Sequence, residues 1–346
     1  MRSGRLLLAK MPAKGGPVIA RYLVTGGAGF IGSHIVDALL AQGHAVRVLD
    51  NLSTGTLDNL AAVRDRIEFI EGDLRDRAAV NHACQAVDSI IHEAAWRSVP
   101  KSMADPVGYT EVNVLGTVHV LEAAAAAKVK RVVCASSSSV YGETASMPLR
   151  EDQPAQPISP YAASKLVDEL YCGLFARSFG LETVAVRYFN VFGPRQSLEN
   201  EYAVVIPKFI VSLLRGQSPP IYGDGKQSRD FTYVDNVVEA TILASHASGI
   251  SGEVFNVALG EEHSVFHLFQ AINAILKTST PPTFQPPRPG DVQRTLADSS
   301  KALRRMDWHG RIGFSEGLRR TVAWFQAHPE RWSSAGEPAR AGSLRR

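Results

Sequence analysis

The chain has 346 residues, of which 45% are hydrophobic and 21% charged, with a formal net charge of +3. This composition is typical of a soluble globular protein with a substantial core, and it excludes a largely disordered chain or a coiled coil. The basic residues are dispersed, so we do not expect a surface that follows the phosphates of a nucleic acid.

Cysteine content and hydropathy indicate a cytoplasmic protein. Cys84, Cys134 and Cys172 are far apart, odd in number and set in apolar surroundings, so they predict neither a disulfide framework nor a zinc site, and we predict no metal site. The apolar run 6–8 is too short for a signal-peptide core, and no segment is apolar over a length that would cross a bilayer. We therefore expect no membrane partner.

Short apolar, β-branched runs alternate with helical patterns through the first half of the chain. The strand-like runs lie at 21–27, 45–50, 67–73, 89–95, 131–139 and 182–190, and helical patterns at 33–43 and 117–129. Such alternation is typical of βαβ units. It predicts an α/β fold with a Rossmann-type doubly wound parallel sheet.

The pattern becomes less regular after residue 190. Proline and glycine clusters at 216–227 and 278–291 interrupt two helical stretches, which indicates a smaller, mixed C-terminal substrate domain over the carboxyl ends of the strands. We therefore predict four parts: a loose N-terminal extension (1–20), the Rossmann domain (21–190), the substrate domain (191–330, with some segments returning to the Rossmann sheet) and a disordered tail (331–346).

A glycine-rich turn follows the first strand pattern. In "LVTGGAGFIGSH", Gly26, Gly29 and Gly32 would let backbone N–H groups approach a pyrophosphate at a helix N-terminus. Taken alone, the glycines could also form a merely structural turn. Asp50 ends the next strand, where a carboxylate would bind a ribose diol and repel a 2′-phosphate, which favours NAD over NADP. Asp73 ends the third strand and could reach the adenine or could simply be solvated.

A tyrosine and a lysine are spaced one helical turn apart in "YAASK", so Tyr161 and Lys165 share a helix face. A phenol in water has a pKa of about 10, and a neighbouring cation favours the phenolate. The strand "RVVCASSSS" ends in small hydroxyls that would lie beside the cofactor. Alone, serine runs are usually turns and an isolated Tyr-x-x-x-Lys is usually a helix surface; together they indicate a site that handles a proton.

Several motifs together resemble the extended short-chain dehydrogenase/reductases, and within them the nucleotide-sugar 4-epimerases, including bacterial UDP-N-acetylglucosamine 4-epimerases. They are the glycine turn with Asp50, "HEAA", "SSSSVYG", "YAASK", "RYFNVFGPRQ" and "RDFTYVD", and the resemblance runs from about Arg21 to Phe325. It implies an enzyme with tightly bound NAD and a UDP-sugar substrate. Family habit also implies a homodimer that pairs the helices containing 117–129 and 161–175.

The resemblance also assigns roles to residues. It implies that Ser137 holds the sugar oxygen, Tyr161 is the base and Lys165 is its partner. The residues implied to bind NAD are Gly26, Gly29, Phe30, Ile31, Gly32, Asp50, Asn51, Ser53, Gly55, Asp73, Leu74, Ala94, Ala95, Asn113, Tyr161, Lys165 and Tyr188. Those implied to bind the substrate are Ser98, Ser137, Ser139, Tyr161, Asn190, Val204, Val205, Tyr222, Arg229, Arg288, Asp291 and Thr295. Arg97 lies where many relatives carry lysine, and Arg288 could instead form a surface ion pair.

The resemblance favours epimerisation over neighbouring reactions. The 4,6-dehydratase and decarboxylase branches place a threonine and acidic residues in the segment that here has only hydroxyls, 136–139. Thr295 occupies a position where a bulky tyrosine restricts relatives to unsubstituted hexoses, so we expect UDP-N-acetylglucosamine and UDP-N-acetylgalactosamine, and also UDP-glucose and UDP-galactose. A UDP-glucuronate 4-epimerase, a non-catalytic NAD-binding relative and a net dehydrogenase remain alternatives; the first commonly carries threonine at the position of Asn190.

Overall fold

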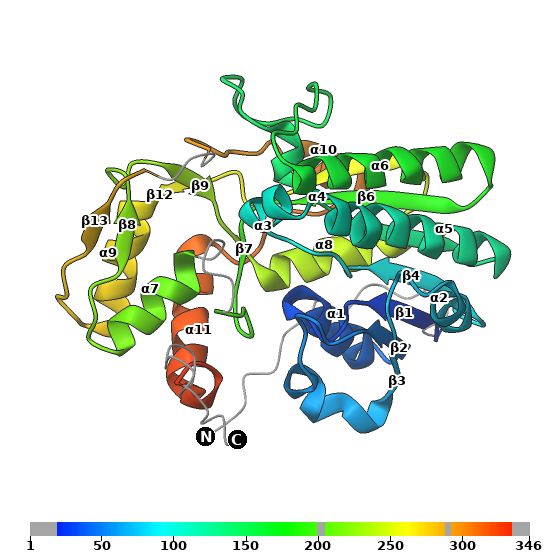
Figure 1. The fold of residues 1–346 in the computed structure, drawn as a ribbon, viewed down its shortest axis with the longest axis horizontal. Coiled ribbons are helices and arrows are strands. Elements are labelled where there is room, and N and C mark those ends of the chain that lie inside the picture. The colour runs from blue at the N-terminus through cyan, green and yellow to red at the C-terminus, as the bar shows by residue number, and fades with distance from the viewer. Residues whose placement is uncertain (1–18, 199–204, 288–291, 334–346) are drawn as a thin grey trace, which may run out of the picture.

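A seven-stranded parallel sheet forms the core of the larger part of the molecule, at the right of Figure 1. The computed structural model describes residues 19–198, 205–287 and 292–333. The sheet order is β11-β6-β5-β4-β1-β2-β3, with strands β1 (Arg21–Thr25), β2 (Ala45–Asp50), β3 (Ile67–Glu71), β4 (Ser89–His92), β5 (Arg131–Ser137), β6 (Glu182–Tyr188) and β11 (Glu253–Val257). The predicted fold class is confirmed. The predicted N-terminal extension and C-terminal tail lie almost wholly outside the described residues.

Helices cover both faces of this sheet. One layer contains α2 (Arg77–Cys84), α5 (Gly116–Ala126) and α6 (Pro160–Ser178), and the other contains α1 (Phe30–Ala41) and α8 (Val234–His246). Strand residues alternate between the two layers: Leu23 packs in the cluster under α2 and α5, whereas Tyr22 and Val24 pack in the cluster under α1. Burial on both faces explains why the strands are continuous apolar runs.

The crevice for a ligand follows from the strand order. Because the order reverses between β1 and β4, the helices that follow these two strands leave in opposite directions, and a space opens at the carboxyl ends. The segment after β4 continues through short helices into α5: α3 (Val99–Ala104), α4 (Pro106–Tyr109) and a π-helical turn η2 (Thr110–Leu115). Two 3₁₀ turns, η1 (Leu57–Arg66) and η3 (Ser138–Tyr141), follow β2 and β5.

A smaller lobe lies beside the sheet, at the left of Figure 1. Its helices α7 (Val205–Leu214), α9 (Val265–Leu276) and α11 (Phe314–Ala327) pack on one another. Three two-stranded ladders pair β7 (Val191–Phe192) with β10 (Thr232–Tyr233), β9 (Ser228–Asp230) with β12 (Glu262–Ser264), and β8 (Pro220–Tyr222) with β13 (Thr283–Gln285). Helix α10 (Ser300–Met306) and the short turn η4 (Pro329–Arg331) complete the described chain.

Residues 234–257 supply helix α8, which packs on the main sheet, and strand β11, which extends it, so the chain returns from the lobe to the Rossmann unit.

All three cysteines are buried and free. Within the described ranges, no helix combines the length and apolar character needed to span a membrane.

Candidate active site

A cavity of about 490 Å³ opens between the carboxyl ends of β5 and β6 and the smaller lobe. It brings together residues that are up to about 265 positions apart in the chain. The predicted site residues that line it are Phe30, Ile31, Ser98, Ser137, Ser139, Tyr161, Tyr188, Asn190, Val205, Tyr222, Arg229 and Thr295. Val204, Arg288 and Asp291 lie outside the described residues.

Helix α6 places Tyr161 at the edge of this cavity. Pro160 occupies the first turn, where its missing N–H costs nothing, and the Ser159 side chain accepts a hydrogen bond from the Ala162 amide at 3.1 Å. Tyr161 therefore lies at the start of the helix, and its ring meets Tyr109 edge-on at a centroid distance of 6.5 Å. These contacts define the position of the phenol.

Lys165 lies one turn further along α6 and behind the cavity wall. Its Nζ donates to Asp168 Oδ2 at 3.1 Å, and both side chains are almost completely buried. Burial alone would lower the pKa of Lys165, but the charge of Asp168 and its hydrogen bond, together with Cys134 and Tyr161, outweigh burial and raise that pKa. Lys165 is therefore a cation at neutral pH.

Serines at the end of β5 and in η3 form a small hydroxyl cluster. The Ser139 hydroxyl donates to Ser137 Oγ at 2.9 Å, and the Ser139 amide donates to the same oxygen at 3.2 Å. Because Ser137 Oγ accepts both bonds, its own proton is available to a ligand in the cavity. Ser136 also lines the cavity, but its hydroxyl donates to Glu169 Oε1 at 2.5 Å.

The glycine turn leaves no room for side chains. Gly26 has φ +69°, and a Cβ there would lie 2.7 Å from the Ala94 amide nitrogen. A Cβ on Gly32 would lie 2.2 Å from the Gly26 carbonyl oxygen. Gly29 precedes α1 as its N-cap without a side-chain cap, so the first amides of that helix can meet an anion. The turn has the close-packed form that a dinucleotide pyrophosphate requires.

Asp50 stabilises this turn through two hydrogen bonds to backbone amides. Its Oδ2 accepts the Ala28 amide at 2.9 Å and its Oδ1 accepts the Leu52 amide at 2.8 Å. Burial raises the pKa of Asp50, and these two bonds oppose the rise. Each carboxylate oxygen can accept a further hydrogen bond, which fits a ribose diol and not a phosphate. A Cβ on Gly55 would meet the Ala28 carbonyl carbon at 2.8 Å, so this loop also packs on the turn.

Asp73 is held by polar side chains of its own neighbourhood. Arg75 donates to both of its oxygens at 2.9 Å, and Asn51 Nδ2 donates to Oδ2 at 2.8 Å. The Arg75 guanidinium holds the pKa of Asp73 well below its usual range. Ser53 donates its amide to Asn51, and Leu74 is buried. The adenine-binding role predicted for Asp73 stays a prediction.

Asn113 ties the loop after β4 to α6. It exchanges hydrogen bonds with the Trp96 backbone at 2.8 and 3.0 Å and donates to Ser164 Oγ at 3.0 Å. It lies in the π-helical turn η2, a rare conformation that often marks functional sites. Ala94 and Ala95 precede Trp96 in this loop, and the Ala94 amide donates to Thr25 at 3.3 Å.

A buried carboxyl lies beside Tyr188. The Tyr188 hydroxyl donates to Glu93 Oε1 at 2.6 Å and contacts Thr241 Oγ1 at 2.8 Å. Burial raises the pKa of Glu93 to about 7, with Tyr188 and Lys165 opposing the rise. The glutamate of "HEAA" received no role from the sequence.

The predicted sugar contacts meet on the opposite wall. Asn190 Nδ2 donates to Thr295 Oγ1 at 3.1 Å, and the Asp230 amide donates to the same hydroxyl at 3.3 Å. Arg229, from β9, donates through Nη1 to the carbonyls of Ser228 and Gln293 at 2.8 and 3.4 Å. Thr295 is thus anchored by its hydroxyl, and its position depends on the lobe.

The cavity also contains residues without predicted roles. Arg97 lines it, and burial lowers the Arg97 pKa while the phenols of Tyr161 and Tyr109 raise it. Gln196 lines it too; its Nε2 donates to Val191, and its buried Oε1 has no hydrogen-bond partner among the described residues. Lys208 and Gln227 are further lining residues. Of these residues, only Arg97 was noticed in the sequence, because isolated polar residues are common in loops and on helix surfaces.

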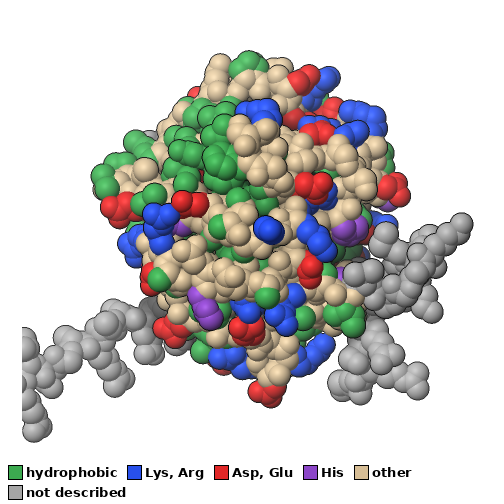
Figure 2. Space-filling view, turned by 90° about the vertical axis from the view of Figure 1, so that its right-hand side faces the viewer, with side chains coloured by type: hydrophobic (Ala, Val, Ile, Leu, Met, Phe, Trp, Pro, Cys, Tyr) green, Lys and Arg blue, Asp and Glu red, His purple; other side chains and the backbone are tan. Residues whose placement is uncertain are grey.

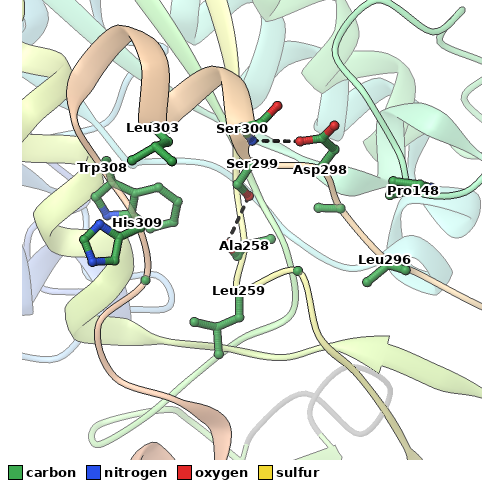
Figure 3. A pocket seen from close by; sticks show the side chains of 13 residues that line it. Pro148, Ala258, Leu259, Leu296, Asp298, Ser299, Ser300, Leu303, Trp308 and His309 are labelled. Atoms are coloured by element: carbon green, nitrogen blue, oxygen red, sulfur yellow. Dashed lines mark hydrogen bonds between the residues drawn. The ribbon is translucent and has the colours of Figure 1, made fainter.

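A second cavity, of about 400 Å³, lies away from these residues beside α10 (Figure 3). Ser299 donates to the Ala258 carbonyl at 3.0 Å, and the Ser300 amide donates to Asp298 at 2.8 Å. The Ser299 hydroxyl and the Asp298 carboxylate are thus bonded to the protein's own backbone, and the first cavity, which contains the predicted residues, is the better candidate.

Comparisons with known proteins identify the family. The profile of the NAD dependent epimerase/dehydratase family matches residues 22–258. A UDP-glucose 4-epimerase from Mycolicibacterium smegmatis is 40% identical over 310 residues, covering 88% of this chain and 98% of that protein. The structure of a UDP-N-acetylglucosamine 4-epimerase from Methanobrevibacter ruminantium M1, in complex with UDP-N-acetylmuramic acid, is 43% identical with a TM-score of 0.86, covering 90% and 99% of the two chains.

A further structure, that of a UDP-glucose 4-epimerase from Thermus thermophilus in complex with NAD, is 40% identical with a TM-score of 0.82, covering 88% of this chain and 99% of that one. The family match spans more than half of the chain. The chain therefore belongs to the NAD-dependent epimerase/dehydratase family, within the extended short-chain dehydrogenase/reductases, and its cofactor is the predicted NAD.

Proposed function

We propose that the protein is a UDP-sugar 4-epimerase that interconverts UDP-N-acetylglucosamine and UDP-N-acetylgalactosamine, with UDP-glucose and UDP-galactose as further substrates. The observation that carries this proposal is the shared cavity of Tyr161, Ser137 and Thr295. A base, a hydroxyl donor and a small residue thereby face one space. Residues 191–330 would bind mainly the UDP-sugar, with Arg229 toward the diphosphate.

The residues around Tyr161 support removal of a proton from a sugar hydroxyl. Phenolate at Tyr161 would accept the proton of the 4-hydroxyl, with Ser137 donating a hydrogen bond to the same sugar oxygen. NAD, when held at the glycine turn, would supply the hydride-transfer chemistry for a transient 4-keto sugar. Lys165, as a buried cation, would stabilise the phenolate.

The opposite wall supports the choice of sugar. Thr295 is short, and its hydroxyl is occupied by Asn190 and the Asp230 amide, so it presents a small side chain to the cavity. A pocket with this wall has room for an acetamido group. The absence of acidic residues between Ser136 and Ser139 supports epimerisation over dehydration, because dehydration needs a further acid and base beside the ketone.

An incubation with single substrates tests the proposal. Purified protein receives UDP-N-acetylglucosamine, UDP-glucose or UDP-glucuronate in deuterated buffer without added cofactor, and NMR identifies the product. We expect the 4-epimer of the acetamido sugar, formed fastest, with no deuterium at the fifth carbon and no stoichiometric NADH. Turnover of UDP-glucuronate alone would contradict the sugar assignment. Deuterium at the fifth carbon would indicate dehydration, and stoichiometric NADH would indicate a dehydrogenase. No reaction with any of the three sugars would favour a binding protein.

We also propose a homodimer through α5 and α6. Figure 2 shows hydrophobic side chains gathered at the height where these helices lie in Figure 1. The exposed apolar residues of α6 and its C-cap include Leu170, Leu174 and the C-cap residue Phe179. Exposed apolar groups of this kind favour association, and sedimentation of Leu170→Glu against the unmodified protein would test it, with a monomer expected for the variant.

A further inference from the structure

The Lys165 ammonium is paired inside the protein and not left to act on Tyr161 alone. Lys165 and Asp168 lie three residues apart on α6, with Nζ 3.1 Å from Oδ2 and side-chain exposures of 4% and 1%. A cation that must stabilise a phenolate is thereby accompanied by a buried anion. The pair as a whole is neutral, so its field at Tyr161 is weaker than that of a lone lysine.

The second oxygen of Asp168 is not used by the fold. Oδ1 is buried, and among the residues that the structure describes it has no hydrogen-bond partner. The Thr117 hydroxyl lies close enough to oppose the rise that burial causes in the pKa of Asp168, but it donates its hydrogen bond to the Asn113 carbonyl at 2.5 Å. A buried carboxylate that serves only stability would be expected to have both oxygens bonded, so the Lys165 contact is the main one that Asp168 makes.

The other ionisable groups around the pair come from α6 and the neighbouring strands. They are Tyr161, Glu169 and Cys172 from α6, Cys134 from β5, His92 from β4, and Glu93 directly after β4. Burial lowers the pKa of His92 to about 3, and hydrogen bonding to Cys172 together with burial raises that of Cys134, so both are neutral at pH 7. Glu169 is paired with Arg187. Asp168 is therefore the negative group that contacts Lys165 directly.

We infer that Asp168 is a positioning residue for the proposed reaction: its carboxylate fixes the Lys165 ammonium behind Tyr161 and moderates the positive field that the ammonium exerts on the phenol. This inference rests on the proposed roles of Tyr161 and Lys165. Asp168 touches neither the cavity nor the reacting atoms, because it is absent from the cavity lining. Its effect would pass through Lys165.

The consequence is a defined pH range for activity. Without the negative charge, the Tyr161–Lys165 pair would lose its first proton at lower pH, because the remaining charge nearby is positive. Lys165 would also lose its own proton more readily, since a buried lysine without a partner is destabilised as a cation. Asp168→Asn should therefore move both limbs of the pH profile of kcat/KM to lower pH.

The experiment compares Asp168→Asn and Asp168→Ser with Asp168→Glu and Glu122→Gln. We expect both uncharged variants to move the acidic limb of the kcat/KM profile to lower pH by about one unit, the lower end of the shift that a close charge causes. We also expect kcat to fall about tenfold with little change in KM, because Lys165 is no longer held in place. In Asp168→Glu, which keeps the negative charge, the acidic limb should lie close to its position in the unmodified protein. Glu122→Gln removes an exposed carboxylate paired with Arg77 and controls for net charge.

A readout that does not require turnover separates this inference from the proposed function. Ultraviolet difference titration of each variant against the same variant carrying Tyr161→Phe follows phenolate formation at Tyr161. A folded, uncharged variant whose phenolate appears at the same pH as in the unmodified protein would overturn the inference, even if epimerisation is observed. A shifted titration in a protein that epimerises no UDP-sugar would support the inference and contradict the proposed function. Two uncharged variants are used so that misfolding of one does not remove the test.

Discussion

Asn190 and Thr295 are 105 residues apart in the chain, yet Asn190 Nδ2 donates to Thr295 Oγ1 over 3.1 Å. Asn190 follows β6 of the main sheet, and Thr295 belongs to a segment that bonds to β9 of the smaller lobe. The bond therefore joins the two parts of the molecule at the cavity wall. The bond fixes the position of the Thr295 side chain, on which the proposed size limit at this wall depends.

Replacement of Thr295 should change which sugar is accepted. In Thr295→Tyr we expect kcat/KM for UDP-N-acetylglucosamine to fall about 100-fold relative to that for UDP-glucose, because the ring fills the space of the acetamido group. Steady-state rates with both sugars measure this. Thr295→Ser keeps the hydroxyl and the small volume, and its ratio should match that of the unmodified protein. Equal losses on both sugars in the tyrosine variant would contradict the proposed gate.

Loss of the Tyr161 hydroxyl should abolish turnover and leave the cofactor in place. In Tyr161→Phe we expect kcat to fall by about 10²–10⁴-fold, the usual contribution of a general base, while the protein retains NAD. Acid extraction and quantification of the dinucleotide provide the second measurement. Near-normal turnover in a fully loaded variant would show that another group removes the proton.

Removal of Glu169 should destabilise the fold around the site. Glu169 accepts from Arg187 at 2.8 and 2.7 Å and from Ser136 at 2.5 Å, and both charged side chains are buried. Glu169→Ala leaves a buried guanidinium uncompensated, so we expect the free energy of unfolding in urea to fall by about 3–5 kcal/mol. Glu122→Ala, which breaks the exposed Arg77 pair, should cost no more than about 1 kcal/mol. Similar costs for the two variants would refute this.

His92 should make stability depend on pH on the acidic side. Its Nδ1 contacts Thr25 Oγ1 at 2.7 Å, its Nε2 contacts Thr117 Oγ1 at 3.0 Å, and burial lowers its pKa from 6.5 to about 3. A histidine with a lowered folded-state pKa contributes stability above its unfolded pKa, and that stability is lost as pH falls toward the folded value.

From these values, the unmodified protein should lose about 2 kcal/mol between pH 7.5 and 5 that His92→Gln does not lose. Urea unfolding at both pH values gives the difference. Parallel pH dependence in the two proteins would mean that His92 accepts a proton while folded.

The glycine turn should not tolerate alanine at its third glycine. A Cβ on Gly32 would lie 2.2 Å from a backbone oxygen, which cannot move aside without opening the turn. We expect Gly32→Ala to lose bound NAD and to unfold at lower temperature. Gly43 is the matched control: it has φ +86° but nothing within 4 Å of its Cβ position, so Gly43→Ala should cost only about 1 kcal/mol and keep NAD. Retention of NAD in Gly32→Ala would contradict the role of the turn.

Local sequence patterns were sufficient to predict the fold class and to select the main candidate residues. Alternating strand and helix patterns, a glycine turn before α1 and Tyr161 four residues before Lys165 are features of neighbouring residues. They follow from backbone sterics and from the helix period, which act over one turn or one strand. For the same reason the family could be named from short motifs.

Contacts between distant residues could not be predicted from the sequence. The Asn190–Thr295 bond, the Glu93–Tyr188 pair and the position of Arg97 beside Tyr161 depend on how the lobe and loops close over the strand ends. Even Asp168, only three residues from Lys165, could not be read as a partner, because the strength of that pair comes from burial. Burial sets the local dielectric and so the strength of every charge at the site, and only the packed structure determines which groups are buried.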